Sequence, residues 1–423
     1  MPRPTLQEWN EAEGVAIMKS NLHTMKLEMR KHSFFIGACV ALMGTACYSC
    51  TGREQVQSDG WTLNLEKAYP HKSLVLQDVA DVKYVRLETD STFLVAGNKV
   101  SCLTDETIGF IDNKSGQMLF FSRADGKKAF SFNRKGRGPE EYLYVGDLAY
   151  DDARDEAYLW CIMEGAFKVY DSSGKYKRTL PLRNARKGDF PIVTQVLDAG
   201  DYLLCSQNRP KGYALHYLLD KQTPSKSVLL DSVPASRVVN IYLQQQTAAG
   251  IRSAAPEVAS VSLSCGKMIV ADYSSDTLFC IRKEGILEKG DFVGKEDAKV
   301  PYIVRTPSVH ASTNQALVSY QGESQDWIFL IRTELSYDFN KQEGFPQRCY
   351  GLQKSTGEIF EVDFKDADFQ KAPGALHRSA SYLQVFDLKE AASAGEILNP
   401  DVRRWVEGLT EDDNGLVRIV DYR

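Results

Sequence analysis

The 423-residue sequence lacks the features that mark several common classes of protein. It has no excess of positive charge: 51 Lys and Arg stand against 56 Asp and Glu, a net charge of -5 that argues against a nucleic-acid binder. Gly 30 and Pro 15 are near average, which excludes collagen-like and proline-rich architectures. With 43% hydrophobic and 25% charged residues, the composition is that of a folded chain rather than a disordered one.

A long apolar run is also missing. The longest run is Phe34–Gly44, which is too short to cross a bilayer because a spanning helix needs ~20 residues. Arg30 and Lys31 precede it and small residues with cysteines follow, the pattern of a secretory signal. Four glutamates in residues 1–28 do not fit a signal, so Met25 or Met29 is the expected translation start. We therefore expect residues 1–50 to be an over-extended start plus a signal peptide, and residues 51–60 a polar tether.

Two cysteines, Cys47 and Cys50, compete for the position that a lipoprotein signal gives to the lipidated cysteine. Cys50 is preferred because the polar stretch begins directly after it, and an ordinary cleaved signal is the alternative. Without residues 1–50 the chain has 46 basic and 52 acidic residues (51 − 5 and 56 − 4), which leaves no basic membrane patch. The lipid would be the only membrane anchor. The expected location is the cell envelope, as an outer-membrane lipoprotein facing the periplasm or the surface.

Clustered metal ligands are absent from the rest of the sequence. Six widely spaced cysteines follow the signal, with no C-x-x-C pair, so no metal site is expected: Cys102, Cys161, Cys205, Cys265, Cys280 and Cys349. Most lie in apolar runs, where a free thiol packs as a small hydrophobe. Cys265 and Cys280 are the one near pair that a disulfide would join.

Catalytic motifs are missing as well. The four histidines of the body (His71, His216, His310 and His377) form no H-E-x-x-H motif, and no nucleophile elbow or P-loop occurs, so no cofactor is expected. The acidic cluster of Asp147, Asp151, Asp152 and Asp155 lacks the spacing of a calcium loop. We expect these carboxylates in solvated turns.

What the sequence does contain is a repeated pattern of short strands from Trp61 onward. Residues 109–132, 158–180 and 268–290 each have an apolar strand, a polar turn, a second apolar strand, a glycine turn and a third strand. Such units cannot bury both faces alone, and radial stacking of four-stranded sheets gives a β-propeller. A helix is expected only near the end, over Asp401–Leu409.

The length sets the number of blades. Residues 61–423 comprise 363 residues, or about 60 for each of six blades, which exceeds the ~40–50 of compact blades and requires long loops. Seven blades and a β-sandwich array are the alternatives. We predict an all-β fold: one six-bladed propeller over residues 61–423 with four-stranded antiparallel blades.

Three segments resemble a largely uncharacterised family of bacterial six-bladed β-propeller lipoproteins. Residues 79–89 (VADVKYVRLET) are similar to its opening strand, and residues 415–422 (GLVRIVDY) to its closing strand. Residues 132–142 (FNRKGRGPEEY) resemble its G-x-G-P-G-E-Y junction, with Glu140 in place of a glycine. Single units, above all residues 270–281, also look like NHL repeats. The resemblance implies the fold and an exported lipoprotein, but no catalytic residue.

The junction is the one candidate binding loop. Gly136 and Gly138 permit a positive φ, and Arg134, Lys135 and Arg137 offer charge for an anion. The alternative is that these are solvated charges or partners of neighbouring glutamates.

The leading functional hypothesis is a binding module without catalysis, which uses the propeller's loops to hold a peptide, a glycan or an envelope protein. The runner-up is a propeller enzyme (a glycan lyase, lactonase or quinone-dependent dehydrogenase) with its site at the central channel. His216, His310 and Arg305 are its candidates by residue type. A purely structural subunit of an envelope complex is the third possibility.

Overall fold

The computed structural model describes residues 61–423 except residues 98, 183–191, 209–213, 235–237, 249, 265–266, 282–298, 307–315 and 374–378. The described residues belong to one compact unit. Cys47, Cys50, Cys265, His310 and His377 lie outside the described residues, so the predictions that involve them stay predictions.

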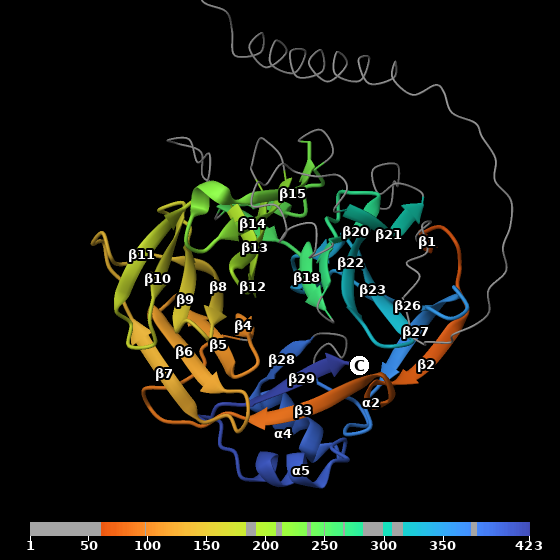
Figure 1. Cartoon of the computed structure of the whole chain (residues 1–423). Helices are drawn as coiled ribbons and strands as arrows, with labels where there is room; N and C mark the ends of the chain where they lie inside the picture. The colour runs from red at the N-terminus through yellow and green to blue at the C-terminus, as the bar shows by residue number, and fades with distance from the viewer. Residues whose placement is uncertain are drawn as a thin grey trace, which may run out of the picture. The chain divides into compact units, whose positions relative to one another are not determined.

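Six small sheets surround a central axis, which confirms the predicted six-bladed β-propeller (Figure 1). The first three blades have four antiparallel strands each, in sequence order from the axis outward. Blade 1 contains β4 (Cys102–Leu103), β5 (Thr107–Asp112), β6 (Gln117–Ser122) and β7 (Lys128–Asn133). Blade 2 contains β8 (Val145–Asp151), β9 (Glu156–Cys161), β10 (Ala166–Tyr170) and β11 (Tyr176–Pro181). Blade 3 contains β12 (Ile192–Ala199), β13 (Tyr202–Asn208), β14 (Ala214–Asp220), the short helix η1 (Pro224–Lys226) and β15 (Val228–Val233).

Blades 4 and 5 each have a fifth strand, which the N-terminal part of the body adds in parallel at the outer edge. Blade 4 contains β18 (Val261–Ser264), β19 (Lys267–Val270), β20 (Thr277–Ile281), β21 (Lys299–Thr306) and then β1 (Trp61–Asn64). Blade 5 contains β22 (Ala316–Glu323), β23 (Trp327–Glu334), β26 (Gln347–Gln353), β27 (Ile359–Lys365) and then β2 (His71–Val75). The two added strands cover edges that would otherwise be open to pairing.

The two ends of the body close the ring in blade 6. Its described strands are β28 (Ala380–Leu383), β29 (Leu416–Tyr422) and β3 (Ala80–Arg86), in that order from the axis. β3 follows the short helix α2 (Leu76–Val79) and pairs antiparallel with β29 along its whole length, from Ala80 opposite Tyr422 to Arg86 opposite Leu416. The segments that resemble a family's opening and closing strands are therefore hydrogen-bonded to each other.

The core lies between neighbouring blades. Phe120 of β6 stacks on Phe130 of β7 with ring centroids 4.3 Å apart, and meets Tyr150 of β8 in the next blade at 5.3 Å. Trp160 and Phe167 of blade 2 are fully buried in a cluster that includes Val193 and Cys205 of blade 3. Each aromatic contact of this kind adds about 0.5–1.5 kcal/mol beyond the area it buries. The high aromatic content is used in these contacts between blades.

Two of the three repeated units and the helix agree with the sequence-based expectations, whereas the last part of the third unit, residues 282–290, lies outside the described residues. Residues 109–132 and 158–180 contain the last three strands of blades 1 and 2, as predicted. The expected helix over Asp401–Leu409 is α5 (Pro400–Glu407), whose first turn is capped by the Asn399 side chain. A preceding helix, α4 (Val385–Ser393), was missed by the sequence analysis. Its cap residue Gln384 makes no side-chain capping bond, so the start signal was absent.

Candidate functional site

One face of the ring collects the long connections. The inner strands β4, β8, β12, β18 and β22 begin at this face, and we call it the loop face. Because neighbouring strands of a blade are antiparallel, the connection between the second and third strands of each blade also lies at the loop face. In blade 6, β3 ends at the loop face, because the chain continues from it into inner strand β4. The first residue of β29 lies opposite the last residue of β3, so β29 begins at the loop face. The segment between β28 and β29 therefore also belongs to the loop face. The described part of the loop face includes residues 87–97, 99–101, 134–144, 162–165, 234, 238–248, 250–260, 335–346 and 384–415.

Exposed apolar side chains are concentrated on this face. Among the described residues, ten large apolar side chains are exposed, and two of them, Leu229 and Leu263, lie in blade strands. The other eight lie in loop-face segments: Leu94, Leu143, Tyr144, Met163, Tyr242, Ile251, Phe386 and Leu398. Single exposed apolar residues are ordinary, but a concentration on one face is typical of an interaction surface.

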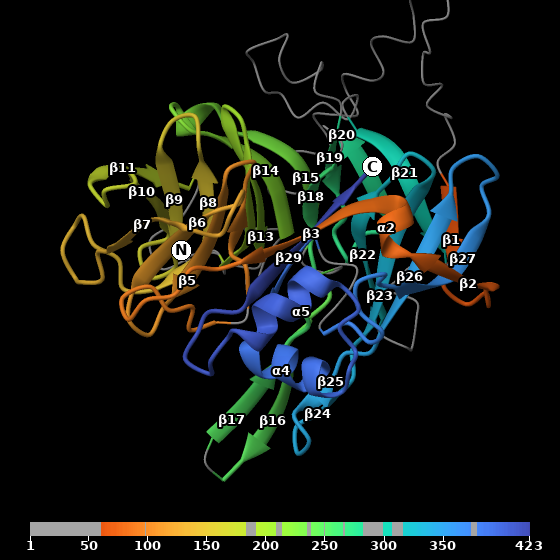
Figure 2. The ribbon, with the colours of Figure 1, turned by 90° about the horizontal axis from the view of Figure 1, so that it is seen from below.

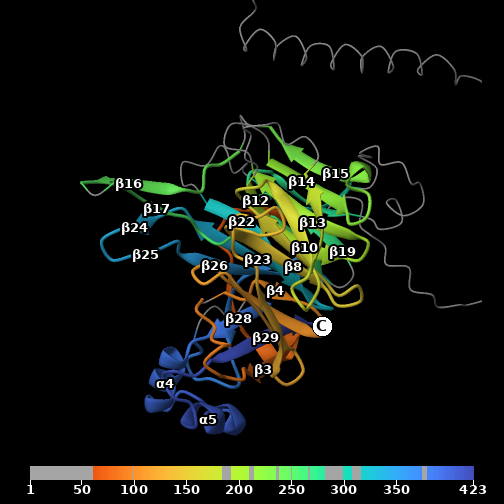
Figure 3. The ribbon, with the colours of Figure 1, turned by 90° about the vertical axis from the view of Figure 1, so that its left-hand side faces the viewer.

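Two hairpins project from the loop face side by side (Figures 2 and 3). β16 (Leu243–Thr247) pairs only with β17 (Gly250–Ala254), and β24 (Tyr337–Asp338) only with β25 (Glu343–Gly344). An isolated two-stranded hairpin is marginally stable in water.

The β24–β25 hairpin has its own aromatic cluster. The ring of Tyr337 lies 5.0 Å from Phe339 and 5.2 Å from Phe345. Phe345 has a φ of 55°, which is rare for a bulky residue and costs about 1–3 kcal/mol. Its amide donates to Ser336 O at 2.6 Å, which holds the strained turn.

An ion pair bridges the loop face at the axis. Lys99 Nζ lies 3.2 Å from Glu257 Oε1, and both side chains are about half exposed. Lys99 precedes blade 1 and Glu257 precedes blade 4, three blade positions away, so the pair joins opposite sides of the ring. Buried Asp147 in β8 accepts from Val196 N at 2.7 Å, and burial raises its pKa to about 6 against the attraction of Lys99.

The expectation that the whole acidic cluster of blade 2 lies in solvated turns is wrong for two of its four members. Asp147 and Asp151 are buried. Lys221 Nζ, fully buried in blade 3, lies 2.5 Å from Asp151 Oδ2 and 2.6 Å from Asp198 Oδ1. The sequence could not reveal this because the partners come from the next blade.

Two of the three residues that an enzyme site would use meet at Asp272. His216 Nε2 lies 2.8 Å from Asp272 Oδ2, and Arg305 donates to Asp272 O at 2.7 Å and to Val318 O at 3.0 Å. All three side chains are at most 1% exposed, so they lie in the packed interior and not on the surface. Burial disfavours the Asp272 carboxylate, but the His216 bond and nearby Arg305 lower its pKa overall. Burial lowers the Arg305 pKa to about 10. The cluster links blades 3, 4 and 5.

The junction loop is organised around Glu141. Its carboxylate accepts from Gly138 N at 2.8 Å, and a Cβ at Gly136 would overlap it. Neither glycine has a positive φ, so close approach, not backbone handedness, explains them.

Arg134, Lys135 and Arg137 lie on this loop, as the sequence indicates. Arg134 Nε donates to Gly174 O at 2.6 Å, and Lys135 Nζ donates to two carbonyls, Asn113 O and Lys114 O, both at 2.8 Å. Arg137 is exposed. Anion binding by this trio stays a prediction, and it would require Glu141 to leave the loop amide that it now occupies.

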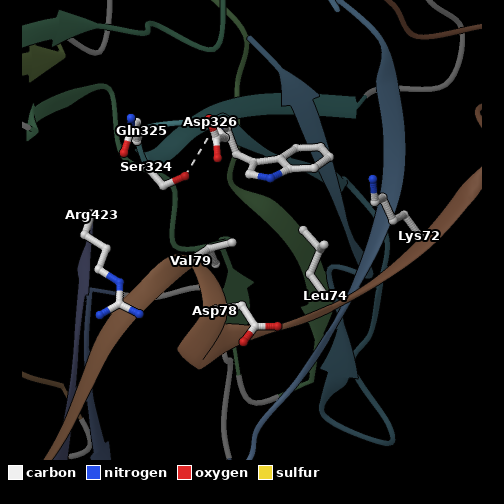
Figure 4. A pocket seen from close by; sticks show the side chains of 9 residues that line it. Lys72, Leu74, Asp78, Val79, Ser324, Gln325, Asp326 and Arg423 are labelled. Atoms are coloured by element: carbon white, nitrogen blue, oxygen red, sulfur yellow. Dashed lines mark hydrogen bonds between the residues drawn. The ribbon is translucent and has the colours of Figure 1, made fainter. Parts of the chain in front are cut away.

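A cleft of about 510 Å³ lies at the opposite face, between blade 5, α2 and Arg423. Figure 4 shows Leu74 and Val79 between four charged side chains, Lys72, Asp78, Asp326 and Arg423. Lys72 Nζ lies 4.7 Å from the Trp327 ring centroid, and Arg423 is paired with Asp81 at 2.5 Å. Both cations are thus held by the protein itself.

Within the described ranges, no group of three or more His, Cys, Asp or Glu side chains is placed to hold a metal ion. No helix among these residues is long and apolar enough to cross a membrane. Cys102 and Cys161 are buried, and burial raises the pKa of each thiol to about 12.

Comparisons with known proteins give a family and a fold. The family model described as "Domain of unknown function (DUF4934)" matches residues 61–421. No curated protein matches the chain. A candidate exported protein of Bacteroides fragilis is 13% identical, with a TM-score of 0.52 over 86% of this chain and 100% of that one. A member of the DUF4221 family from Bacteroides vulgatus is 10% identical, with a TM-score of 0.46 over 82% of this chain and 99% of that one. At such identities the first likeness is one of fold alone.

Proposed function

The chain belongs to the DUF4934 family, and we propose that its propeller is a binding module without catalysis, which holds a partner protein on the loop face. The observation that carries the proposal is the position of the exposed large apolar side chains, since eight of the ten found among the described residues lie on that face. Aromatic and aliphatic side chains that fill pockets of a partner supply most of the energy of a protein interface. The projecting hairpins would extend the contact area.

Two of the three catalytic candidates, His216 and Arg305, are enclosed, and the third, His310, lies outside the described residues. His216, Asp272 and Arg305 are all buried between blades, where they join sheets. An enzyme would instead need ionisable groups in an open pocket.

A test of the binding role compares variants of the two kinds of exposed apolar residue. The triple variant Tyr144→Ser/Met163→Ser/Ile251→Ser removes three loop-face side chains that are 49%, 59% and 62% exposed. Leu229→Ser is the matched control, because Leu229 is 47% exposed on outer strand β15. We expect a protein that co-purifies reproducibly with the wild-type chain from its own cells to be lost with the triple variant and kept with Leu229→Ser. Equal retention by all three chains would reject the loop face as the binding surface.

We further propose that the chain is exported and attached to the cell envelope by a lipid on Cys50 or Cys47. The short apolar run, its basic flank and the polar tether support this, and one chain of similar fold is itself named as a candidate exported protein. Intact mass measurement of the mature protein is expected to give an acylated N-terminal cysteine. A mature N-terminus without lipid would contradict the anchor but not the binding role.

A further inference from the structure

The α4–α5 insertion has an unusual distribution of charge for a part of the loop face. Residues 384–415 contain eight acidic residues (Asp387, Glu390, Glu396, Asp401, Glu407, Glu411, Asp412 and Asp413) and three basic ones (Lys389, Arg403 and Arg404). The net charge is therefore 3 − 8 = −5, compared with −5 for the entire chain.

The basic residues of the insertion are engaged within it. Arg404 pairs with Asp401 at 3.2 Å, Arg403 Nε donates to Ile397 O at 3.1 Å, and Lys389 Nζ lies 3.4 Å from Glu407 O. Among the described residues, Asp401 is the only one of the eight carboxylates in an ion pair. Asp413 accepts hydrogen bonds from Thr410 and is attracted by Arg86, and the other six carboxylates leave an acidic surface that ion pairs among the described residues do not neutralise.

The inner side of the insertion is packed and its outer side is not. Leu388, Val402 and Val406 are at most 1% exposed in a cluster that also contains Leu416 of β29. Phe386, in the first turn of α4, is 74% exposed, and Glu390 lies one helical turn further on the same side. Figures 2 and 3 show α4 and α5 at the border of the ring, toward the side from which the hairpins project. A large aromatic side chain thus stands in solvent beside unpaired carboxylates.

From this juxtaposition we propose that the α4–α5 insertion docks a basic polypeptide segment of a partner protein, with Phe386 inserted between its apolar side chains. The inference rests on the proposed function and adds the chemistry of the partner. Unpaired carboxylates attract Lys and Arg from a distance and select against acidic partners. A solvated Phe gains energy only when a partner buries it, and such aromatic residues are frequent among the dominant contacts of interfaces.

The test uses the full-length chain and three fluorescent eight-residue peptides, with alternating Lys and Leu, alternating Glu and Leu, or Lys with Ser in place of Leu. Fluorescence anisotropy measures binding. We expect the Lys–Leu peptide to bind most tightly, the Lys–Ser peptide more weakly because Phe386 gains no apolar contact, and the Glu–Leu peptide not to bind. Higher salt should weaken Lys–Leu binding.

Four variants locate the contact. Phe386→Ala and Glu390→Lys are each expected to weaken Lys–Leu binding about tenfold, and Phe386→Leu to keep most of it. Two controls outside the loop face, Leu229→Ala on β15 and Glu358→Lys between β26 and β27, are both exposed and should change it less than about twofold. Equal binding by the wild type and Phe386→Ala, or equal losses with the two controls, would overturn the inference. In that case, loss of the co-purifying protein from the Tyr144→Ser/Met163→Ser/Ile251→Ser variant would still support the loop face as the binding surface. Only the inference that the partner presents a basic segment would be rejected.

Discussion

At the scale of single residues, buried polar and ionisable side chains join neighbouring blades. Lys221 reaches from blade 3 to Asp151 of blade 2, His216 from blade 3 to Asp272 of blade 4, and Arg305 from blade 4 to Val318 O of blade 5. A buried ion pair is worth little compared with apolar packing, but removal of one partner strands the other charge. These residues thus fix blades 2, 3, 4 and 5 against one another.

We expect Asp272→Ala to lower the free energy of unfolding by about 3 kcal/mol at pH 7, because His216 would lose its buried partner. The pKa of Asp272 is lowered in the fold, so its contribution is present above the ordinary carboxyl pKa and disappears as the pH falls through the lowered value. Denaturant unfolding at pH 7 measures the loss. The double variant with His216→Ala should lose less than the sum of the two single losses, and strict additivity would contradict a direct pair.

Asp147 is expected to act in the opposite direction. Its pKa is raised from 3.8 to about 6 by burial, so the folded chain holds this proton more tightly than the unfolded chain does. The cost of the charged form therefore grows as the pH rises from about 4 to 6 and persists above. Asp147→Asn keeps an oxygen for Val196 N and should stabilise the protein by about 1–3 kcal/mol at pH 8, with little effect at pH 4. An effect of equal size at both pH values would show that charge is not the cause.

At the scale of elements, the strands at the two ends of the body differ in importance. β3 and β29 close the ring, whereas β1 and β2 only add fifth strands to complete sheets. The added strands still bury apolar side chains, since Leu63 is fully buried.

We predict that a chain beginning at Leu76 folds with a melting temperature about 5–10 °C lower, because it loses the β1 and β2 contacts but keeps β3. A chain ending at Gly415 lacks β29 and should lose cooperative unfolding. Calorimetry of both chains distinguishes the two roles. A cooperative transition in the chain without β29 would mean that blade 6 does not close the ring.

The strands were predictable from the sequence because each blade repeats one local pattern. Apolar runs and Gly or Asp turns marked β5–β7 and β9–β11, and the segments around β3 and β29 resembled a family's two end strands. The segment that forms β1 and β2 carries no such signal, because these strands pair with strands of blades 4 and 5 that are more than 200 residues away in the sequence. Helix α4 was not predicted, because its N-cap residue Gln384 is not one of the residue types that signal the start of a helix.

At the scale of the whole molecule, the ring leaves one face for recognition. The loop face has the hairpins, the α4–α5 insertion and most of the exposed apolar side chains, and the axial ion pair of Lys99 and Glu257 ties its opposite sides. The sequence predicted long loops and a loop face that binds, but not which connections form that face, because the side of each connection is fixed by antiparallel strand order within the blades. The same order places His216 and Arg305 between blades rather than at an open channel.

The central claim is that the loop face binds a protein partner, and photo-crosslinking in cells tests it most directly. A photoreactive amino acid replaces Met163, Ile251 or Phe386 on the loop face, or Leu229 on β15, in separate full-length chains. The account predicts one recurrent protein adduct from the three loop-face positions and none from Leu229. Adducts from Leu229 alone, or no adduct from any loop-face position, would contradict it.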